Sequence, residues 1–260
     1  MKICFFGTAS AIPNQDRFRS SLAVEAASGA FLIPDCGELV SAEIIRRGVM
    51  PDQVATLIVT HLHPDHIVGL PLILQHFQLR GRTLPLTVYL PGEGIESVKA
   101  FLSTVYLGPE MLKFEVTYAP IQAGVEYQAG DFTFSFLPNN HLIHHAGVRQ
   151  KAGFDVKGES YSLVFSDGEK KVIYSGDVAK AAELLPLFTP DVDALILEYA
   201  HTSAEEALEL AAEPAIPPQV ILTHIHPRFA ADMVSPVPGW VCAADGMEIV
   251  IKKGCVLNND

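Results

Sequence analysis

A cluster of metal-binding residue types directly after a buried strand constrains this chain more than any other feature. The segment Thr60-His61-Leu62-His63-Pro64-Asp65-His66 packs three histidines and one aspartate into six residues, and it follows the apolar run Ala55 to Val59. An apolar run of this length is typical of a buried strand. Imidazole and carboxylate together suit zinc and related divalent ions. Four candidate ligands at the end of one strand predict a site that can serve two metals.

Further ligand-type residues stand at matching positions later in the chain, each soon after an apolar, strand-like run. Because loops at strand ends are free to carry chemistry in layered α/β folds, we expect these residues to gather at one site. A polar loop with chance histidines is the competing interpretation, and the scarcity of histidine in proteins disfavours it. The runs and their side chains are Phe132–Leu137 with His141, Val172–Gly176 with Asp177, and Gln219–Thr223 with His224.

The ordered series H-x-H-x-D-H, a lone histidine, S-G-D and T-H resembles the motif series of the metallo-β-lactamase fold hydrolases, over nearly the whole chain. Within that superfamily the chain looks closest to the ribonuclease Z-like branch. Gly7 to Pro13 resembles its opening glycine-rich loop, Asp35 to Glu38 its D-C-G-E turn, and Thr223 to Phe229 its T-H-x-S-x-R-[YF] segment. The resemblance implies a four-layer αββα sandwich, whereas periodicity alone predicts only a mixed α/β fold.

Carried over position by position, the resemblance implies a dinuclear metal centre. A metal-bridging hydroxide would be the nucleophile, because two dications lower the pKa of a shared water to around 7. Zinc is the first choice, with iron or manganese as alternatives, since imidazole–carboxylate sites do not select strongly by affinity. Asp65 is also predicted to be catalytic. The ligands would be His61, His63 and His141 for one metal, Asp65, His66 and His224 for the other, and Asp177 as the bridge.

The residue at position 66 bears on the type of reaction. Oxygen-reducing di-iron members of the superfamily commonly carry an acidic residue at the corresponding position. This chain carries His66 there. The resemblance therefore favours hydrolysis over oxygen chemistry.

The segment Leu197 to Ser203 supplies a candidate acid. It resembles a condensed version of two ribonuclease Z-like motifs, with Glu198 as the glutamate and His201 as the histidine that donates a proton to the leaving oxygen. A phosphodiester needs such a proton because an alkoxide leaves poorly. A carboxylate bonded to the histidine would fix its tautomer. The competing interpretation is a helix cap at Thr202 or Ser203, which leaves Glu198 and His201 unexplained.

Two alignments are open after His141. In one, Gly147 to Arg149 takes the place of the family's G-Y-R. In the other, Ser160 to Leu163 does, and residues 142–159 form an insertion. His141 is the ligand in both, because it follows the strand. The interval holds two further histidines that face either substrate or solvent, His144 and His145.

The substrate is expected to be a small or flexible phosphodiester. Transfer-RNA processing members carry a basic P-x-K-x-R-N loop, of which Pro13 to Phe18 keeps only the proline and the arginine, and a long Gly/Pro-rich arm, which is missing after His141. A net charge of −12 also argues against a broad nucleic-acid-binding surface. Transfer-RNA 3′-end cleavage is therefore the less favoured alternative, beside hydrolysis of lactones, thioesters or sulfate esters on the same metal core.

The remaining features predict one cytoplasmic domain over residues 1–260. No apolar run has membrane-spanning length, the start is too short for a signal peptide core, and the four cysteines are scattered. The resemblance allows a homodimer, although no stretch identifies an interface. Helices are expected near 39–47, 70–79, 95–106, 181–187 and 203–212. Strands are expected near 2–6, 22–25, 30–33, 55–59, 86–90, 113–118, 126–128, 131–137, 161–165, 171–174, 194–197, 220–223 and 247–252.

Overall fold

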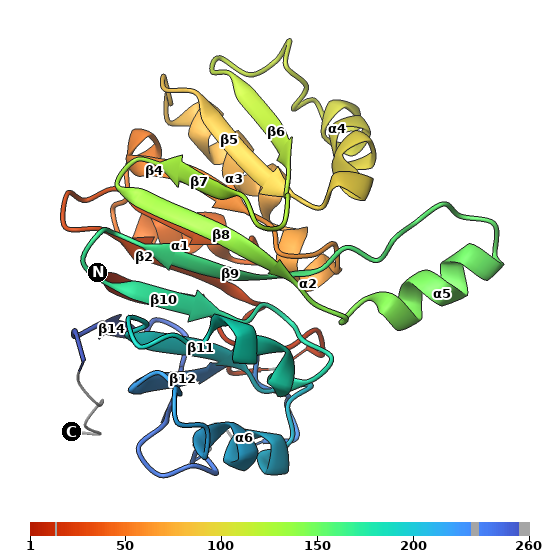
Figure 1. Ribbon diagram of the computed structural model, residues 1–260. Helices are drawn as coiled ribbons and strands as arrows, with labels where there is room; N and C mark the ends of the chain where they lie inside the picture. The colour runs from red at the N-terminus through yellow and green to blue at the C-terminus, as the bar shows by residue number, and fades with distance from the viewer. Residues whose placement is uncertain (14, 230–233, 255–260) are drawn as a thin grey trace.

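Two seven-stranded sheets lie face to face in the computed structural model, which describes residues 1–13, 15–229 and 234–254 (Figure 1). The first sheet has the spatial order β14 (Glu248–Val250), β1 (Lys2–Gly7), β2 (Ser21–Glu25), β3 (Phe31–Pro34), β4 (Val54–Ile58), β5 (Leu86–Leu90) and β6 (Val116–Pro120). The second has the order β13 (Val241–Cys242), β12 (Gln219–Thr223), β11 (Ala194–Glu198), β10 (Lys171–Tyr174), β9 (Tyr161–Ser166), β8 (Phe132–Pro138) and β7 (Glu126–Ala129).

Helices cover the outer faces of both sheets. The first sheet is covered by α1 (Val40–Arg46), α3 (Leu70–Leu79) and α4 (Ile95–Thr104). The second is covered by η3 (Ala181–Leu187) and α6 (Ala204–Ala211). Three short helices lie in connections, η1 (Pro51–Gln53), α2 (Pro64–Ile67) and η2 (Gly92–Gly94). One helix, α5 (Ile143–Lys151), stands off from both sheets (Figure 1). The layering is the predicted αββα sandwich.

Alternation along the strands explains why the sheets stack. Phe132, Phe134 and Phe136 occupy every second position of β8 and point into the core between the sheets. On β4, Leu57 packs toward the outer helices, whereas Ile58 packs between the sheets. Full burial of a large apolar side chain stabilises a fold by about 1.5–3 kcal/mol. A slip of one residue would expose the whole row, so the register of each strand is firmly set.

The register brings several strand ends to one edge. β10 to β13 run parallel, and β9 is antiparallel to both β8 and β10, so β8 and β10 end on the same side. β3 to β6 of the first sheet also run parallel. A backbone hydrogen bond of 3.2 Å from Tyr161 N to Thr60 O joins the two sheets at this edge. The loops that follow these strands therefore meet, as is typical of sites in layered folds.

Most elements lie within a residue or two of their expected places, and the differences have local causes. The strand expected at 113–118 begins at Val116, because the backbone of Lys113 donates instead to Gln78 Oε1 at 2.6 Å. The helix expected at 181–187 is a 3-10 helix with Pro186 inside it, since proline cannot donate an α-helical hydrogen bond. The helix expected to reach Tyr106 ends at Thr104, because Tyr106 has a positive φ of 62°.

The pattern missed five short elements, η1, α2, η2, α5 and β13, of which α5 is the longest. The pattern predicts no helix within residues 142–159, and α5 lies there. Its sequence, IHHAGVRQK, has few apolar residues and a central glycine, so it lacks the periodicity that marks a helix packed on a core. The structure explains the weak signal, because α5 buries only Ala146.

Within the described ranges, no helix is both long and apolar enough to cross a membrane. Cys4, Cys36 and Cys242 are free thiols, and burial raises the pKa of Cys4 to about 11. Asn14 of the opening loop and the fourth cysteine, Cys255, lie outside the described residues.

Candidate metal centre

The edge where the strands end brings together all seven residues predicted as metal ligands. They form two groups whose candidate ligand atoms lie within 4.8 Å of one another, His61 with His63, His141 and Asp177, and Asp65 with His66 and His224. A third, overlapping group consists of Asp177, His201 and His224. The residues come from loops after β4, β8, β10, β11 and β12 and from α2. The sequence therefore predicted which side chains meet; that they hold metals stays a prediction.

The short helix α2 carries Asp65 and His66 into the second group of candidate ligands. Pro64 occupies its first position, where the fixed φ of proline favours the start of a helix. His66 O accepts a hydrogen bond of 2.8 Å from Cys36 N, which ties α2 to the turn after β3. A Cβ at Gly69 would lie 2.1 Å from Gly37 O, so only glycine permits this approach.

Asp177 lies between the two groups and turns one carboxylate oxygen toward each. Its Oδ2 is 3.8 Å from His61 Nε2 and 3.6 Å from His141 Nε2. Its Oδ1 is 3.4 Å from His66 Nε2 and 3.4 Å from His224 Nδ1. This is the arrangement required of a carboxylate shared by two ions.

Several buried polar atoms of the cluster have no hydrogen-bond partner. A buried unpaired polar group costs about 1–3 kcal/mol, and native proteins rarely leave one unpaired. Atoms that bind one tetrahedral zinc at about 2.1 Å lie about 3.4 Å apart, close to the 3.4–3.8 Å separations around Asp177. The donor set therefore fits divalent metal ions. The unpaired atoms are His61 Nε2, Asp65 Oδ1, His66 Nε2, Asp177 Oδ1 and His224 Nδ1.

Asp35 supports the centre from behind, a role that the sequence did not predict. Its Oδ2 lies 2.7 Å from His66 Nδ1, which leaves His66 Nε2 facing the cluster. Thr60 N and Tyr174 OH each donate to the Asp35 carboxylate at 2.8 Å. A carboxylate on the second nitrogen of a ligating histidine fixes its tautomer and its ring orientation. Asp35 pays a conformational cost for this position, because its φ is 60°.

Glu198 and His201 lie beside the cluster, as predicted. Glu198 is fully buried and accepts hydrogen bonds from Ala200 N at 2.8 Å and from His201 N at 2.9 Å. His201 Nδ1 lies 3.4 Å from Glu198 Oε2 and 3.7 Å from Asp177 Oδ2, and 41% of its side chain is exposed. Ser203 also caps α6, so the competing helix-cap interpretation is correct as well. The cap leaves Glu198 and His201 available for chemistry.

Four of the candidate ligand histidines fall into two classes, those whose pKa is lowered and those whose pKa is raised. Burial lowers the pKa of His141 to about 4 and that of His61 well below its ordinary value, so both are neutral, which is the metal-binding form. Burial is again the largest single influence and opposes protonation of His66 and His224, but the neighbouring carboxylates together outweigh it, Asp177 foremost, with Asp35 beside His66 and with Asp65 and Glu198 beside His224. The pKa of His224 is raised to about 9 and that of His66 well above its ordinary value.

The family follows from a match over most of the chain. A family model described as anti-Pycsar protein Apyc1 matches residues 1–232. The chain belongs to this family. Ribonuclease Z of Methanothermobacter thermautotrophicus is 28% identical to it over 274 aligned positions, which cover 88% of each protein. The ribonuclease Z of Bacillus subtilis is 26% identical over 314 positions, which cover 98% of this chain and 100% of the relative.

Solved structures share the fold of this Apyc1 family member. The metallo-β-lactamase fold protein YhfI from Bacillus subtilis superimposes with a TM-score of 0.74 at 21% identity, over 95% of this chain and 98% of that one. The short form of human tRNase Z gives a TM-score of 0.75 at 19% identity, over 97% and 100%. The predicted fold and the resemblance to the ribonuclease Z-like branch are confirmed, and with them the prediction of a metal-dependent hydrolase.

In this family member, the interval after His141 follows the second of the two alignments. Asn139 N donates to Ser160 O at 2.9 Å, so the chain enters β9 directly beside the end of β8. Residues 142–159 form an insertion that contains α5. The insertion carries His145 to the rim of the centre, where its ring centroid lies 5.2 Å from that of His63.

Proposed function

We propose that this chain is a metal-dependent phosphodiesterase that acts on small or flexible phosphodiesters and forms one domain over residues 1–260. The Asp177 carboxylate carries the proposal, because its two oxygens face two separate groups of candidate ligands. Asp65 belongs to the second group, and His201 lies on the open side. The ribonuclease Z relatives support the same reaction class.

The two groups would hold two divalent metal ions, for which zinc is preferred over iron or manganese. When bound, such ions lower the pKa of water to about 7 and stabilise negative charge in the transition state. The chain's own part is to fix the donor atoms. One ion would be held by His61, His63 and His141, and the other by Asp65, His66 and His224. Asp177 would contribute to both.

His201 is the proposed acid. It is the most exposed histidine of the cluster, so it can reach the leaving oxygen of a bound ester. Burial opposes its protonation, but the hydrogen bond and charge of Glu198 together with the charge of Asp177 outweigh this and raise the pKa of His201 above its ordinary value. Glu198 holds the backbone of the same turn, so it positions the ring as well. General acid catalysis of this kind contributes typically about 10²–10⁴-fold.

RNA is the less favoured substrate. The chain has a net charge of −12, and an RNA backbone is bound through positive charge. The insertion before β9 contains one short helix, α5, of nine residues. Lactones, thioesters and sulfate esters remain alternative substrates for the same donor set. We also propose a cytoplasmic location and a homodimer, the latter to be tested by light scattering.

The test is turnover of bis(p-nitrophenyl) phosphate by the purified protein, with zinc, iron and manganese measured on the same sample. We expect two metals per chain and clear turnover that a chelator removes. A precursor transfer RNA and a panel of lactones, thioesters and sulfate esters run in parallel. Two metals with turnover of the panel alone would replace the phosphodiesterase proposal, and cleavage of the transfer RNA alone would replace its substrate class.

A further inference from the structure

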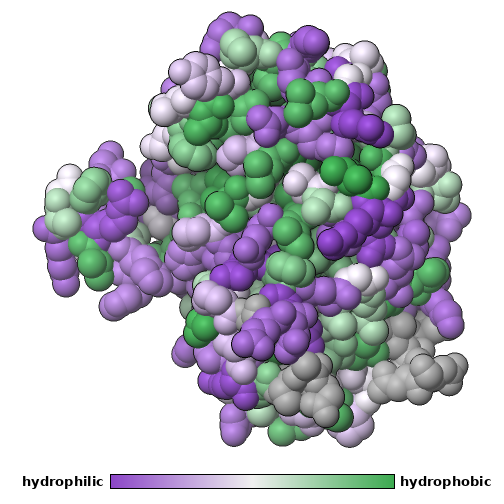
Figure 2. Space-filling model, turned by 180° about the vertical axis from the view of Figure 1, so that it is seen from behind, coloured by the Kyte–Doolittle hydropathy of each residue, from purple (hydrophilic) through white to green (hydrophobic). Residues whose placement is uncertain are grey.

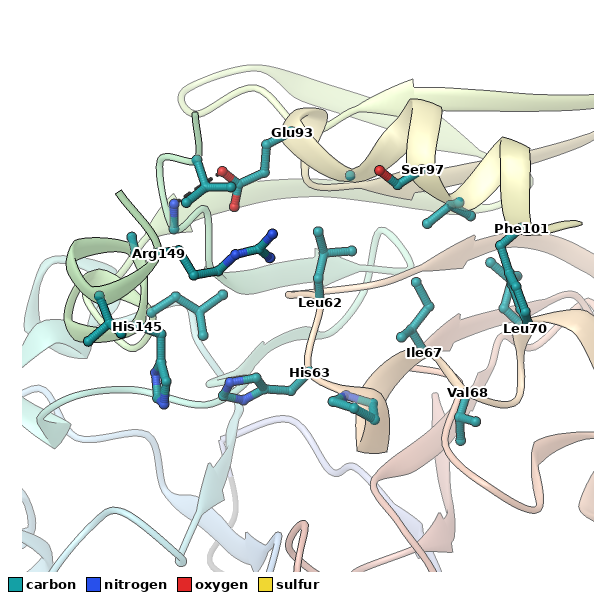
Figure 3. A pocket seen from close by; sticks show the side chains of 18 of the residues that line it. Leu62, His63, Ile67, Val68, Leu70, Glu93, Ser97, Phe101, His145 and Arg149 are labelled. Carbon is teal, nitrogen blue, oxygen red and sulfur yellow. Dashed lines mark hydrogen bonds between the residues drawn. The ribbon is translucent and has the colours of Figure 1, made fainter. Parts of the chain in front are cut away.

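A cavity of about 780 Å³ opens directly beside the metal centre, between α5 and the helices on the first sheet (Figures 2 and 3). His63, a candidate metal ligand, forms part of its wall. The cavity therefore borders the metal centre at His63. A group held at that end of the cavity would lie beside the metals.

The wall of this cavity is largely apolar. One side comes from α2, α3 and α4 and the loop before α2, and the facing side comes from α5 and the segment after it. Figure 3 shows Leu62, Ile67 and Phe101 turned toward the same space. Phe101 is 55% exposed and Val68 is 54% exposed, which is unusual for large apolar side chains grouped beside a reaction centre. An apolar wall of this kind has little to offer a polar nucleic-acid backbone.

Two charged side chains line the cavity, Glu93 and Arg149, and they differ in their contacts within the protein. The Glu93 carboxylate accepts backbone hydrogen bonds from Lys157 N, from Gly158 N at 3.1 Å and from Glu159 N at 3.0 Å. Arg149 lies over the ring of Phe154 at 4.5 Å from its centroid. Among the residues that the structure describes, no carboxylate forms an ion pair with Arg149, and Figure 3 shows its side chain extending into the cavity.

The side of the cavity formed by α5 is held in place by specific contacts. The Glu93 carboxylate fixes the segment that follows α5 against η2. Gly158 has a φ of +73°, and a Cβ there would lie 2.8 Å from Ala146 Cβ, so only glycine permits this closure onto α5. The cavity is therefore a built feature of the chain.

We propose that this cavity is the binding subsite for an apolar ester group of an anionic phosphodiester. The inference rests on the proposed function and names the substrate class more closely. The volume falls within the range of about 300–1,000 Å³ that is typical of small-molecule pockets. Because His63 belongs to both the metal centre and the cavity wall, a phosphodiester bound at the metals would extend one ester group into the cavity. The positive charge of Arg149 complements the negative charge of the diester.

The test compares two p-nitrophenyl phosphodiesters that share the leaving group and differ in the retained alkyl group, methyl or cyclohexylmethyl. We expect kcat/KM for the cyclohexylmethyl ester to exceed that for the methyl ester by about tenfold or more, since the larger alkyl group buries more apolar surface in the cavity. Ser97→Trp fills the cavity from α4 and should reduce this ratio to near one. Ser103→Trp, the same change on the same helix away from the cavity, should keep the wild-type ratio.

A second variant, Phe101→Ala, removes an apolar side chain from the cavity wall. Because Phe101 is exposed, the change should not affect folding. It should also lower the ratio of kcat/KM for the two esters. A binding measurement adds a readout without turnover. Fluorescence titration of metal-stripped protein with 2-naphthylmethyl methyl phosphate should saturate, and Ser97→Trp should abolish the binding.

The outcomes separate the two proposals. Turnover of both diesters at equal kcat/KM, with no response to Ser97→Trp, would overturn the subsite and leave the phosphodiesterase in place. Saturable probe binding that Ser97→Trp removes, with neither diester hydrolysed, would support the subsite and overturn the proposed function. Neither binding nor turnover would overturn both.

Discussion

The metal centre and the α5 arm, residues 143–158, lie side by side but are held in different ways. Each side chain of the centre follows a buried strand or lies on α2, and two of the rings have a supporting contact outside the cluster, His61 with Thr60 and His66 with Asp35. The arm exposes Ile143, Val148 and Phe154. It is fastened at its far end through one carboxylate, that of Glu93.

This difference implies different roles for the two regions: the metal centre carries out the reaction, and the arm determines which ester is preferred. A reaction centre built on strand ends of two stacked sheets is fixed by the core, because any shift would disturb packed side chains. A peripheral arm can change in sequence at little cost to the core. The account therefore predicts that variants in the centre abolish the reaction, whereas variants in the arm change which ester is preferred.

The largest effect is expected from His66→Ala. This change removes a ligand of the second group, so we expect loss of one metal per chain and a fall in turnover by about 10⁴-fold or more, as is typical when one member of a catalytic unit is removed. Circular dichroism should show a folded protein. Retained activity together with an unchanged metal content would contradict the account.

The next effect is expected at His201. His201→Ala should slow a diester with an alkoxide leaving group by about 10²–10⁴-fold, because such a group needs a proton. A p-nitrophenyl ester should be slowed far less, since nitrophenolate leaves without help. Steady-state kinetics on the two esters checks this, and equal slowing of both would remove the role of His201 as acid.

A smaller effect is expected at Asp35, which contacts the imidazole of His66. Asp35→Asn should weaken metal binding by about 10–100-fold, because the neutral amide holds the His66 imidazole less firmly. Tyr174→Phe removes one hydrogen bond to the same carboxylate, so it should weaken metal binding less than Asp35→Asn does. Competition with a chromophoric chelator measures both affinities. Equal affinities for Asp35→Asn and the wild type would show that the contact only stabilises the fold.

The smallest effect is expected in the arm. Glu93→Ala removes the acceptor for three backbone N–H groups, so hydrogen exchange at residues 157–159 should become faster. Metal content should stay at the wild-type level, because Glu93 does not belong to the cluster of candidate ligands. Unchanged exchange at these amides would show that the arm is held by other contacts.

The sequence predicted the centre better than its surroundings, for a physical reason. His61, Asp177 and His224 each follow a strand-like apolar run, and strand ends are readable from periodicity. Asp35 lies far from His66 in the sequence, and nothing local indicates that its turn reaches the imidazole. The division of Asp177 between two groups likewise depends on the stacking of the sheets. Helix α5 was missed because it buries too little surface to leave a periodic pattern.

The most direct test of the central claim is the number of metal ions bound by Asp177→Ala, measured beside the wild type and Asp65→Ala after identical loading with zinc. The account predicts two ions in the wild type, one in Asp65→Ala and none retained after dialysis in Asp177→Ala, because Asp177 faces both groups of ligands. Two ions retained by Asp177→Ala would contradict a centre built around one shared carboxylate.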